Sequence, residues 1–274
     1  MNWKSFGVRT AVAVVYGPLM LASVWFGGLL LFTLIGIVAL LCYWEYVKLV
    51  ERKQAFAQLL PGLSASAIAV SLIYFRPDLL PIYLVLAPTI FFFVEIYRRR
   101  GSPLVNLATT LFGSFYYPLF LGSFLAVRRL GSDFNFDPYA PATWLILVLV
   151  VTWVCDTAAY MVGANWGKHK LIERVSPNKT IEGAIAGFLL GILTAYICHI
   201  TFVRLITLSD SLVIGAVVSG VGQYGDLFES LLKRDAGVKD SSNLIPGHGG
   251  FLDRFDSLTT VTPLVYLYLR YFAL

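Results

Sequence analysis

The sequence predicts an all-α, polytopic integral membrane protein with about nine transmembrane helices. Of its 274 residues, 58% are hydrophobic and only 14% are charged, whereas a soluble globular domain carries about 25% charged residues. Apolar stretches of about 20 residues, the length that crosses a bilayer, recur along the chain. Lysines and arginines gather between these stretches, a pattern typical of topology signals and anionic-lipid contacts and not of a nucleic-acid-binding surface.

Each apolar stretch is expected to be a helix, because backbone in contact with lipid must satisfy its hydrogen bonds internally. Gly27 and Gly28 divide the first two stretches, and Pro77 and Pro81 mark the turn between the third and the fourth. The predicted helices cover residues 10–26, 28–47, 59–75, 79–97, 104–127, 141–163, 182–203, 211–232 and 257–273.

Nine crossings place most of the 21 lysines and arginines on one side of the membrane. The positive-inside rule then puts the N-terminus in the cytoplasm and the C-terminus outside. Residues 1–140 are expected to form about five spans, and residues 141–274 a catalytic region with two cytoplasmic motif loops at 164–181 and 233–256. One helical hairpin joins these loops, so they can meet on the cytoplasmic face of a cytoplasmic (inner) membrane.

The eighth predicted helix carries Asp226, Glu229, Ser230 and Lys233 at spacings that place them on one face. A carboxylate buried near the centre of a membrane helix costs ~2.5–3.5 kcal/mol, and a bound cation would offset that cost. The alternative is a structural carboxylate paired with Lys233 or with another helix. Gln223 in the same segment would add a metal ligand or only a helix contact.

After this helix, a proline and three glycines surround His248, which predicts a turn with exposed amides suited to a phosphate. Asp253 and Asp256 follow at the start of the ninth helix. Together with Asp226 they would form a three-carboxylate pocket for one or two Mg²⁺ ions. The alternative is solvated charge at a helix N-terminus. Arg254 fits a phosphate, an acidic lipid head group or a positive-inside anchor.

A second polar constellation follows Asp156, which lies near the cytoplasmic end of the sixth predicted helix. Thr180 is expected to cap the seventh helix, with Lys179 directly before it, and free amides beside a lysine bind anions well. Ordinary interfacial charge is the alternative for this segment. The basic and imidazole side chains between these positions are Lys168, His169, Lys170 and Arg174.

The stretch from Ser230 to Asp256 resembles the signature of the phosphatidate cytidylyltransferases, also called CDP-diacylglycerol synthases. The matching residues are Ser230, Leu232, Lys233, Arg234, Lys239, Asp240, Ser242, Pro246, His248, Gly249, Gly250, Asp253, Arg254 and Asp256. The upstream block is similar to the family at Asp156, Ala159, Tyr160, Gly163, Gly167, Lys168, Lys170, Leu171, Ser176, Pro177, Lys179, Thr180, Glu182 and Gly183. It departs at Ala158, Ala164 and Ile181, where glycine, a basic residue and tryptophan are common, so the phosphate contacts of this loop are open.

The resemblance implies a reaction in which CTP and phosphatidate give CDP-diacylglycerol and pyrophosphate. It implies that Asp226, Asp253 and Asp256 bind one or two Mg²⁺ ions, and it leaves room for a monovalent cation. The catalytic residues would be these three with Lys233, Arg234 and His248. The substrate-binding residues would be Asp156, Lys168, Lys170, Ser176, Lys179, Thr180, Glu182, Lys239, Asp240, Gly249, Gly250 and Arg254. The partners would be CTP, phosphatidate and bilayer lipid, with no nucleic acid, and a homo-oligomer is compatible with this.

Two other functions fit parts of the pattern. A CTP-dependent enzyme similar to polyprenol kinases would also join a lipid with CTP, but it would release CDP and a phosphorylated alcohol. A transporter or cation channel is a different class, since Asp156 and Asp226 could line an ion path. The dense basic loops and the uncharged distal halves of the predicted spans argue against a channel.

Overall fold

The computed structural model of the chain describes residues 3–245 and 249–274, and for residues 3–13 it describes the backbone only. The α-helices are α1 (Trp3–Phe26), α2 (Gly28–Glu51), α3 (Leu59–Phe75), α4 (Leu80–Tyr97), α5 (Pro103–Asp133), α6 (Ala140–Trp166), α7 (Ile181–Thr201), α8 (Leu208–Asp235) and α9 (Leu252–Tyr268). A 3₁₀ turn (Pro77–Leu79) precedes α4, and a π-helical turn (Leu269–Ala273) follows α9. The strands are β1 (Lys170–Ile172) and β2 (Ser176–Thr180).

Apolar helices dominate the chain, as expected for a multi-pass membrane protein. Among the described residues, six helical segments are long and apolar enough to cross a bilayer: Gly28–Glu51, Pro77–Tyr97, Pro103–Asp133, Ala140–Trp166, Ile181–Thr201 and Leu208–Asp235. Two shorter apolar helices, Val14–Phe26 and Leu59–Phe75, accompany them. The expectation of a membrane-embedded, helical protein is therefore confirmed at this level.

The helix bounds differ from the predicted ones mainly at polar ends. Helix α3 has the predicted range, but α9 begins at Leu252 rather than at residue 257. Hydropathy marks the part of a helix that lies in lipid, whereas its hydrogen bonds continue into polar residues. The all-α expectation also missed β1 and β2, which form an antiparallel hairpin with Lys170 opposite Thr180.

The chain forms two compact units. One contains the residues up to Ser23, Gly27–Ala126 and Asp235–Arg254; the other contains Val24–Phe26, Val127–Arg234 and Phe255–Leu274. The loop between α8 and α9 thus packs in the first unit, although it follows most of the second in sequence. The functional division expected near residue 140 stays a prediction.

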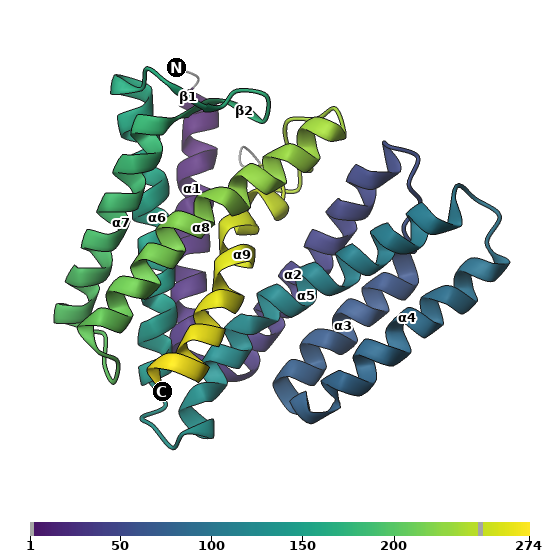
Figure 1. Ribbon diagram of the computed structural model, residues 1–274, viewed down its shortest axis with the longest axis horizontal. Helices are drawn as coiled ribbons and strands as arrows, with labels where there is room; N and C mark the ends of the chain where they lie inside the picture. The colour runs from purple at the N-terminus through teal and green to yellow at the C-terminus, as the bar shows by residue number, and fades with distance from the viewer. Residues whose placement is uncertain (1–2, 246–248) are drawn as a thin grey trace. The chain divides into compact units, whose positions relative to one another are not determined.

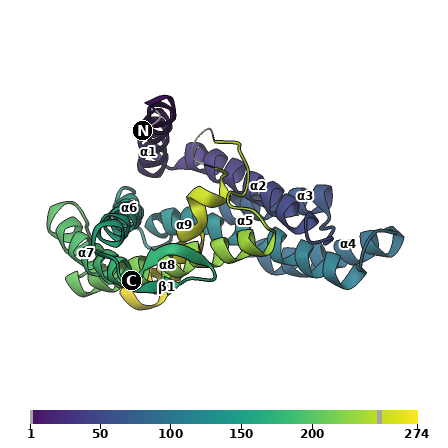
Figure 2. The same ribbon diagram turned by 90° about the horizontal axis from the view of Figure 1, so that it is seen from above.

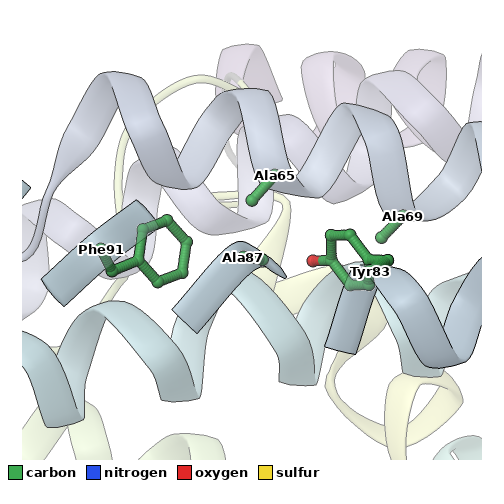
Figure 3. Close-up of a cluster of buried hydrophobic side chains, with 5 residues drawn as sticks. All are labelled: Ala65, Ala69, Tyr83, Ala87 and Phe91. Carbon is green, nitrogen blue, oxygen red and sulfur yellow. The ribbon is translucent and has the colours of Figure 1, made fainter. Parts of the chain in front are cut away.

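In the first unit, α3 lies between α2 and α4 (Figure 2). Small side chains on α3 leave room for rings on α4: Ala65 and Ala69 face Tyr83, Ala87 and Phe91 in a buried cluster (Figure 3). Small residues let apolar helices approach closely, and the resulting van der Waals packing is one of the forces that hold helices together in lipid.

In the second unit, α6 and α7 run side by side and α8 packs against them (Figure 1). Gly191 of α7 faces Ser219 of α8, and no room remains for a Cβ atom on Gly191. The Ser219 hydroxyl donates a hydrogen bond to the backbone oxygen of Gly215 at 2.6 Å. Gln223 Nε2 donates to the backbone oxygen of Ala184 at 3.1 Å, so Gln223 makes a contact between helices.

Helices α8 and α9 are in close contact at Gly225. A Cβ atom there would meet the backbone oxygen of Asp256 and the hydroxyl of Thr260 at less than van der Waals distance. One turn away, the Ser257 hydroxyl donates to the backbone oxygen of Gly222 at 3.0 Å. This close approach sets the separation of the polar side chains that flank it on the two helices.

Candidate active site

The polar face predicted for α8 is formed as expected. Ser230 Oγ donates to Asp226 Oδ1 at 3.3 Å, and Lys233 Nζ lies 2.8 Å from Glu229 Oε2. The side chains of Glu229 and Lys233 are 6% and 11% exposed. These i, i+4 pairs hold four polar side chains in one row along the helix.

Three carboxylates converge where this row meets the first turn of α9. One carboxylate oxygen each from Asp226, Glu229 and Asp256 lies within 4.8 Å of the others, and we call these three residues the acidic cluster. Two unit charges 4 Å apart repel by about 4 kcal/mol at an effective dielectric constant of 20. The fold therefore needs positive charge near this point.

Part of that charge comes from lysines. Lys179, at the end of β2, places Nζ 2.5 Å from Asp226 Oδ2, and Lys233 pairs with Glu229. Two ammonium groups leave three carboxylates with a net negative charge. In proteins, Mg²⁺ is usually bound by a few carboxylates, and waters or substrate phosphates complete its coordination. The acidic cluster therefore fits a divalent cation in charge and in donor chemistry.

Asp253, predicted as a metal ligand, has another set of contacts. Its Oδ2 accepts hydrogen bonds from Ser241 N at 3.0 Å, from Ser241 Oγ at 2.8 Å and from Gly250 N at 2.7 Å. It thereby holds the loop between α8 and α9 against the start of α9. The structure brings Asp226 and Asp256 together as predicted, with Glu229 as the third member, and the metal role of Asp253 stays a prediction.

The signature also includes charged residues in this loop and at the adjoining ends of α8 and α9. Lys239, Asp240, Arg234 and Arg254 are exposed. Gly249 has a φ of 79°, a left-handed conformation that glycine adopts without strain, and it forms a β-bridge with Ile245. Residues 246–248, including His248 and its predicted catalytic role, lie outside the described residues.

The first motif loop is ordered by Glu182, in the first turn of α7. The Glu182 carboxylate lies 2.6 Å from His169 Nδ1 and accepts hydrogen bonds from the backbone amides of Lys168 and His169. These contacts fold the basic segment back onto the helix, and the exposed side chains of Lys168 and Lys170 project from it. Ser176 begins β2. So short a hairpin leaves no periodic signal in the sequence.

Thr180 caps α7 as predicted, because its hydroxyl accepts a hydrogen bond from Gly183 N at 3.2 Å. Lys179 is placed differently from the expectation of an open anion site, since its ammonium group contacts Asp226. Arg234 Nε donates to the Val175 backbone oxygen at 3.4 Å. The first motif loop therefore contacts α8 at two points. Asp156 is exposed on α6, which continues beyond it to Trp166.

Replacing Thr180 with alanine is expected to lower the stability of the protein by about 1 kcal/mol, because one amide at the start of α7 loses its acceptor. Thr180→Ser should keep the bond and the stability. Thermal unfolding in detergent measures both variants. Thr194→Ala, which removes an exposed hydroxyl within α7, is the matched control. Equal destabilisation by serine and alanine would show that the cap contributes nothing.

The model of a family described as "Cytidylyltransferase family" matches residues 7–272. The phosphatidate cytidylyltransferase of Bacillus subtilis (strain 168) is 36% identical over 244 residues, which cover 89% of this chain and 81% of the relative. That of Brucella melitensis biotype 1 is 34% identical over 268 residues, covering 97% and 93%. The likeness therefore extends through the N-terminal helices, beyond the signature that carries the resemblance in the sequence.

Proposed function

The chain belongs to the cytidylyltransferase family, and from this we infer that it makes CDP-diacylglycerol and pyrophosphate from CTP and phosphatidate. It is a multi-pass membrane nucleotidyltransferase of phospholipid biosynthesis. The observation that carries this conclusion is a family match over nearly the whole chain, together with an acidic cluster that fits a divalent cation. The bacterial relatives support a location in the inner membrane.

The reaction needs little acid–base chemistry from the protein. A phosphate oxygen of phosphatidate attacks the α-phosphorus of CTP, the bond from this phosphorus to the β-phosphate oxygen breaks, and pyrophosphate leaves. Because the attacking phosphate is already ionised at neutral pH, no strong general base is required. Catalysis then depends on positioning the two substrates and on neutralising their charge.

We propose that Asp226, Glu229 and Asp256 hold the divalent cation. This cation is Mg²⁺, present as one or two ions, and a monovalent cation can accompany it. When bound, the cation neutralises phosphate oxygens and stabilises the leaving pyrophosphate. Asp226 and Asp256 keep their predicted role, and Asp253 remains a proposed ligand. Lys233 holds the Glu229 carboxylate in place through its 2.8 Å ion pair.

Basic side chains on both motif loops are proposed to bind the phosphates. Lys179 supports this role, because it carries a positive charge beside Asp226. The exposed candidates are Lys168, Lys170, Arg234, Lys239 and Arg254. Arginine can bind phosphate oxygens through two parallel hydrogen bonds, and lysine binds them as a point charge. All of these groups come from one chain. The proposed phosphate contacts are therefore the same whether the protein is a monomer or a homo-oligomer.

For the membrane topology, we propose nine crossings with a cytoplasmic N-terminus, an external C-terminus and an active site facing the cytoplasm. The supporting observation is the distribution of lysines and arginines, which gather at the predicted inner ends of the spans. This orientation gives the site direct access to cytoplasmic CTP, while the acyl chains of phosphatidate stay in the bilayer.

The decisive experiment supplies the purified protein with phosphatidate, Mg²⁺ and CTP in detergent micelles. The CTP is labelled on the α-phosphate in one reaction and on the γ-phosphate in another. We expect label on the α-phosphate to enter the lipid and label on the γ-phosphate to leave as pyrophosphate, in equal amounts. A kinase acting on a lipid alcohol would instead place the γ-label in the lipid and release CDP. A transporter or channel would transfer neither label. Either of these results would overturn the proposed reaction.

A further inference from the structure

A carboxylate in the N-terminal part of the chain contacts the loop between α8 and α9 (residues 236–251). Glu45 lies on α2, within an apolar span, and is fully buried. Its Oε1 accepts hydrogen bonds from Ser242 Oγ at 2.6 Å and from Phe251 N at 2.9 Å. Its Oε2 accepts from Leu252 N at 2.9 Å and lies 2.9 Å from Ser241 Oγ. Both oxygens are therefore engaged by the loop and by the start of α9.

These contacts join two separate parts of the loop to a single side chain. Ser241 and Ser242 directly follow the exposed Asp240, whereas Phe251 and Leu252 directly follow the glycine turn. The amides of Phe251 and Leu252 open α9, where backbone N–H groups lack helical partners and the helix dipole favours negative charge. The carboxylate thereby fixes the distance between the two sides of the loop.

Gly250, two residues before α9, packs directly against this carboxylate. A Cβ atom on Gly250 would overlap both Glu45 oxygens and the Ser241 hydroxyl, so this position has room only for glycine. Ser241 Oγ also lies 2.8 Å from Asp253 Oδ2. The serine hydroxyl is thus placed between two carboxylates, one from α2 and one from α9.

We propose that Glu45 is a positioning residue of the active site, which holds the described parts of this loop, residues 236–245 and 249–251, in their working conformation. Glu45 itself touches no substrate in this proposal. It gives the N-terminal helices a role in the reaction beyond spanning the membrane. The inference rests on the proposed binding role of Lys239, Asp240, Gly249 and Gly250.

A matched carboxylate elsewhere in the same unit separates positioning from simple stability. Glu95 on α4 is also buried, at 5% exposed, and accepts hydrogen bonds from Gln58 Nε2 at 2.8 Å and Asn106 Nδ2 at 2.7 Å. It also pairs with Arg98 at 2.9 Å. Its partners lie around the connections between α2 and α3 and between α4 and α5, and none belongs to either motif loop. Glu95→Gln therefore makes the same chemical change at a carboxylate whose hydrogen-bond partners include no signature residue.

The experiment compares Glu45→Gln, Glu45→Asp and Glu95→Gln. In Glu45→Gln, one acceptor oxygen becomes an NH₂ group that faces donors, so the loop must shift. A displacement of about 1 Å in an active site costs about 10²-fold in rate, and we expect kcat/KM to fall by that order at unchanged amounts of folded protein. Glu45→Asp keeps the charge and should restore part of the rate. Glu95→Gln should retain wild-type turnover per folded molecule even if it melts earlier.

A second readout does not depend on activity. Trypsin cleavage after Lys239, measured in the folded protein in detergent, should be faster in Glu45→Gln than in Glu95→Gln. Ser242→Ala should lower turnover alone but add little in the Glu45→Gln background, because both changes remove the same contact. Faster cleavage with normal turnover would refute a role of this loop in catalysis. Unchanged cleavage and turnover would refute the anchor itself. Inactive wild-type protein would instead refute the proposed reaction.

Discussion

Changing Asp226 or Asp256 to asparagine is expected to lower the kcat of CDP-diacylglycerol synthesis by about 10³-fold, the loss seen when one preorganised charge-stabilising group is removed from an active site. Each change keeps the shape of the side chain but removes one negative charge from the acidic cluster. The cation should then bind more weakly. Initial rates measured over a series of Mg²⁺ concentrations should show a lower maximum and a higher half-saturating concentration.

The control for these variants is on the same helix. Asp210 lies at the other end of α8, is 9% exposed and accepts hydrogen bonds from Thr207 N and Tyr268 Oη. Asp210→Asn should lower stability but leave turnover per folded molecule unchanged. Wild-type rates and Mg²⁺ dependence in both Asp226→Asn and Asp256→Asn would contradict the cation site.

The same titration identifies the third ligand. Glu229 belongs to the acidic cluster, whereas Asp253 was predicted from the sequence and accepts hydrogen bonds from the loop. The half-saturating Mg²⁺ concentration should rise in Glu229→Gln if Glu229 is the ligand, and in Asp253→Asn if Asp253 is. Asp253→Ala is expected to abolish turnover in either case, because it removes the acceptor that holds Ser241 and Gly250.

Gly225→Ala is expected to reduce kcat by about 10²-fold, because a methyl group there forces α9 away from α8 and separates Asp226 from Asp256. The added Cβ would lie 2.9 Å from the Asp256 backbone oxygen and 2.6 Å from Thr260 Oγ1. In a helix, alanine is intrinsically better than glycine by about 1 kcal/mol. A loss of activity would therefore come from the helix contact and not from a weakened α8.

Gly220→Ala provides the comparison for this prediction. A Cβ atom at Gly220 would meet only the ring of Phe188, at 3.4 Å and beyond, which is ordinary contact. This variant should have wild-type kcat and equal or higher thermal stability. If Gly225→Ala and Gly220→Ala behave alike, the close approach of α8 and α9 does not set the geometry of the acidic cluster.

The sequence predicted the features that depend on local spacing. The range of α3, the Thr180 cap and the polar face of α8 follow from hydropathy, capping chemistry and helical periodicity, and the structure confirms them. The placement of Asp253 and Lys179 depends on how the loops turn back on the helices. Spacing along the chain does not determine such paths, so these contacts could not be foreseen.

Glu45 was missed for a different reason, since a usable signal was present. A lone carboxylate within an apolar span is costly to bury and marks a functional or structural partner. Asp226 was recognised because other polar residues follow it closely in the sequence. Glu45 and Glu95 satisfy the same criterion, but their partners lie far away in the sequence or across a turn, where no periodic pattern points to them.

The bonds of Glu45 also bear on how the protein is made. They link α2 to residues that lie 196 to 207 positions further along the chain. A ribosome adds about 5–20 residues per second, so a nascent chain spends many seconds in the membrane with α2 in place and its partners not yet synthesised. Until Leu252 emerges, the Glu45 carboxylate lacks the full set of donors that it has in the finished protein. Completion of the loop is therefore one of the last steps of biogenesis, and truncated products lack it.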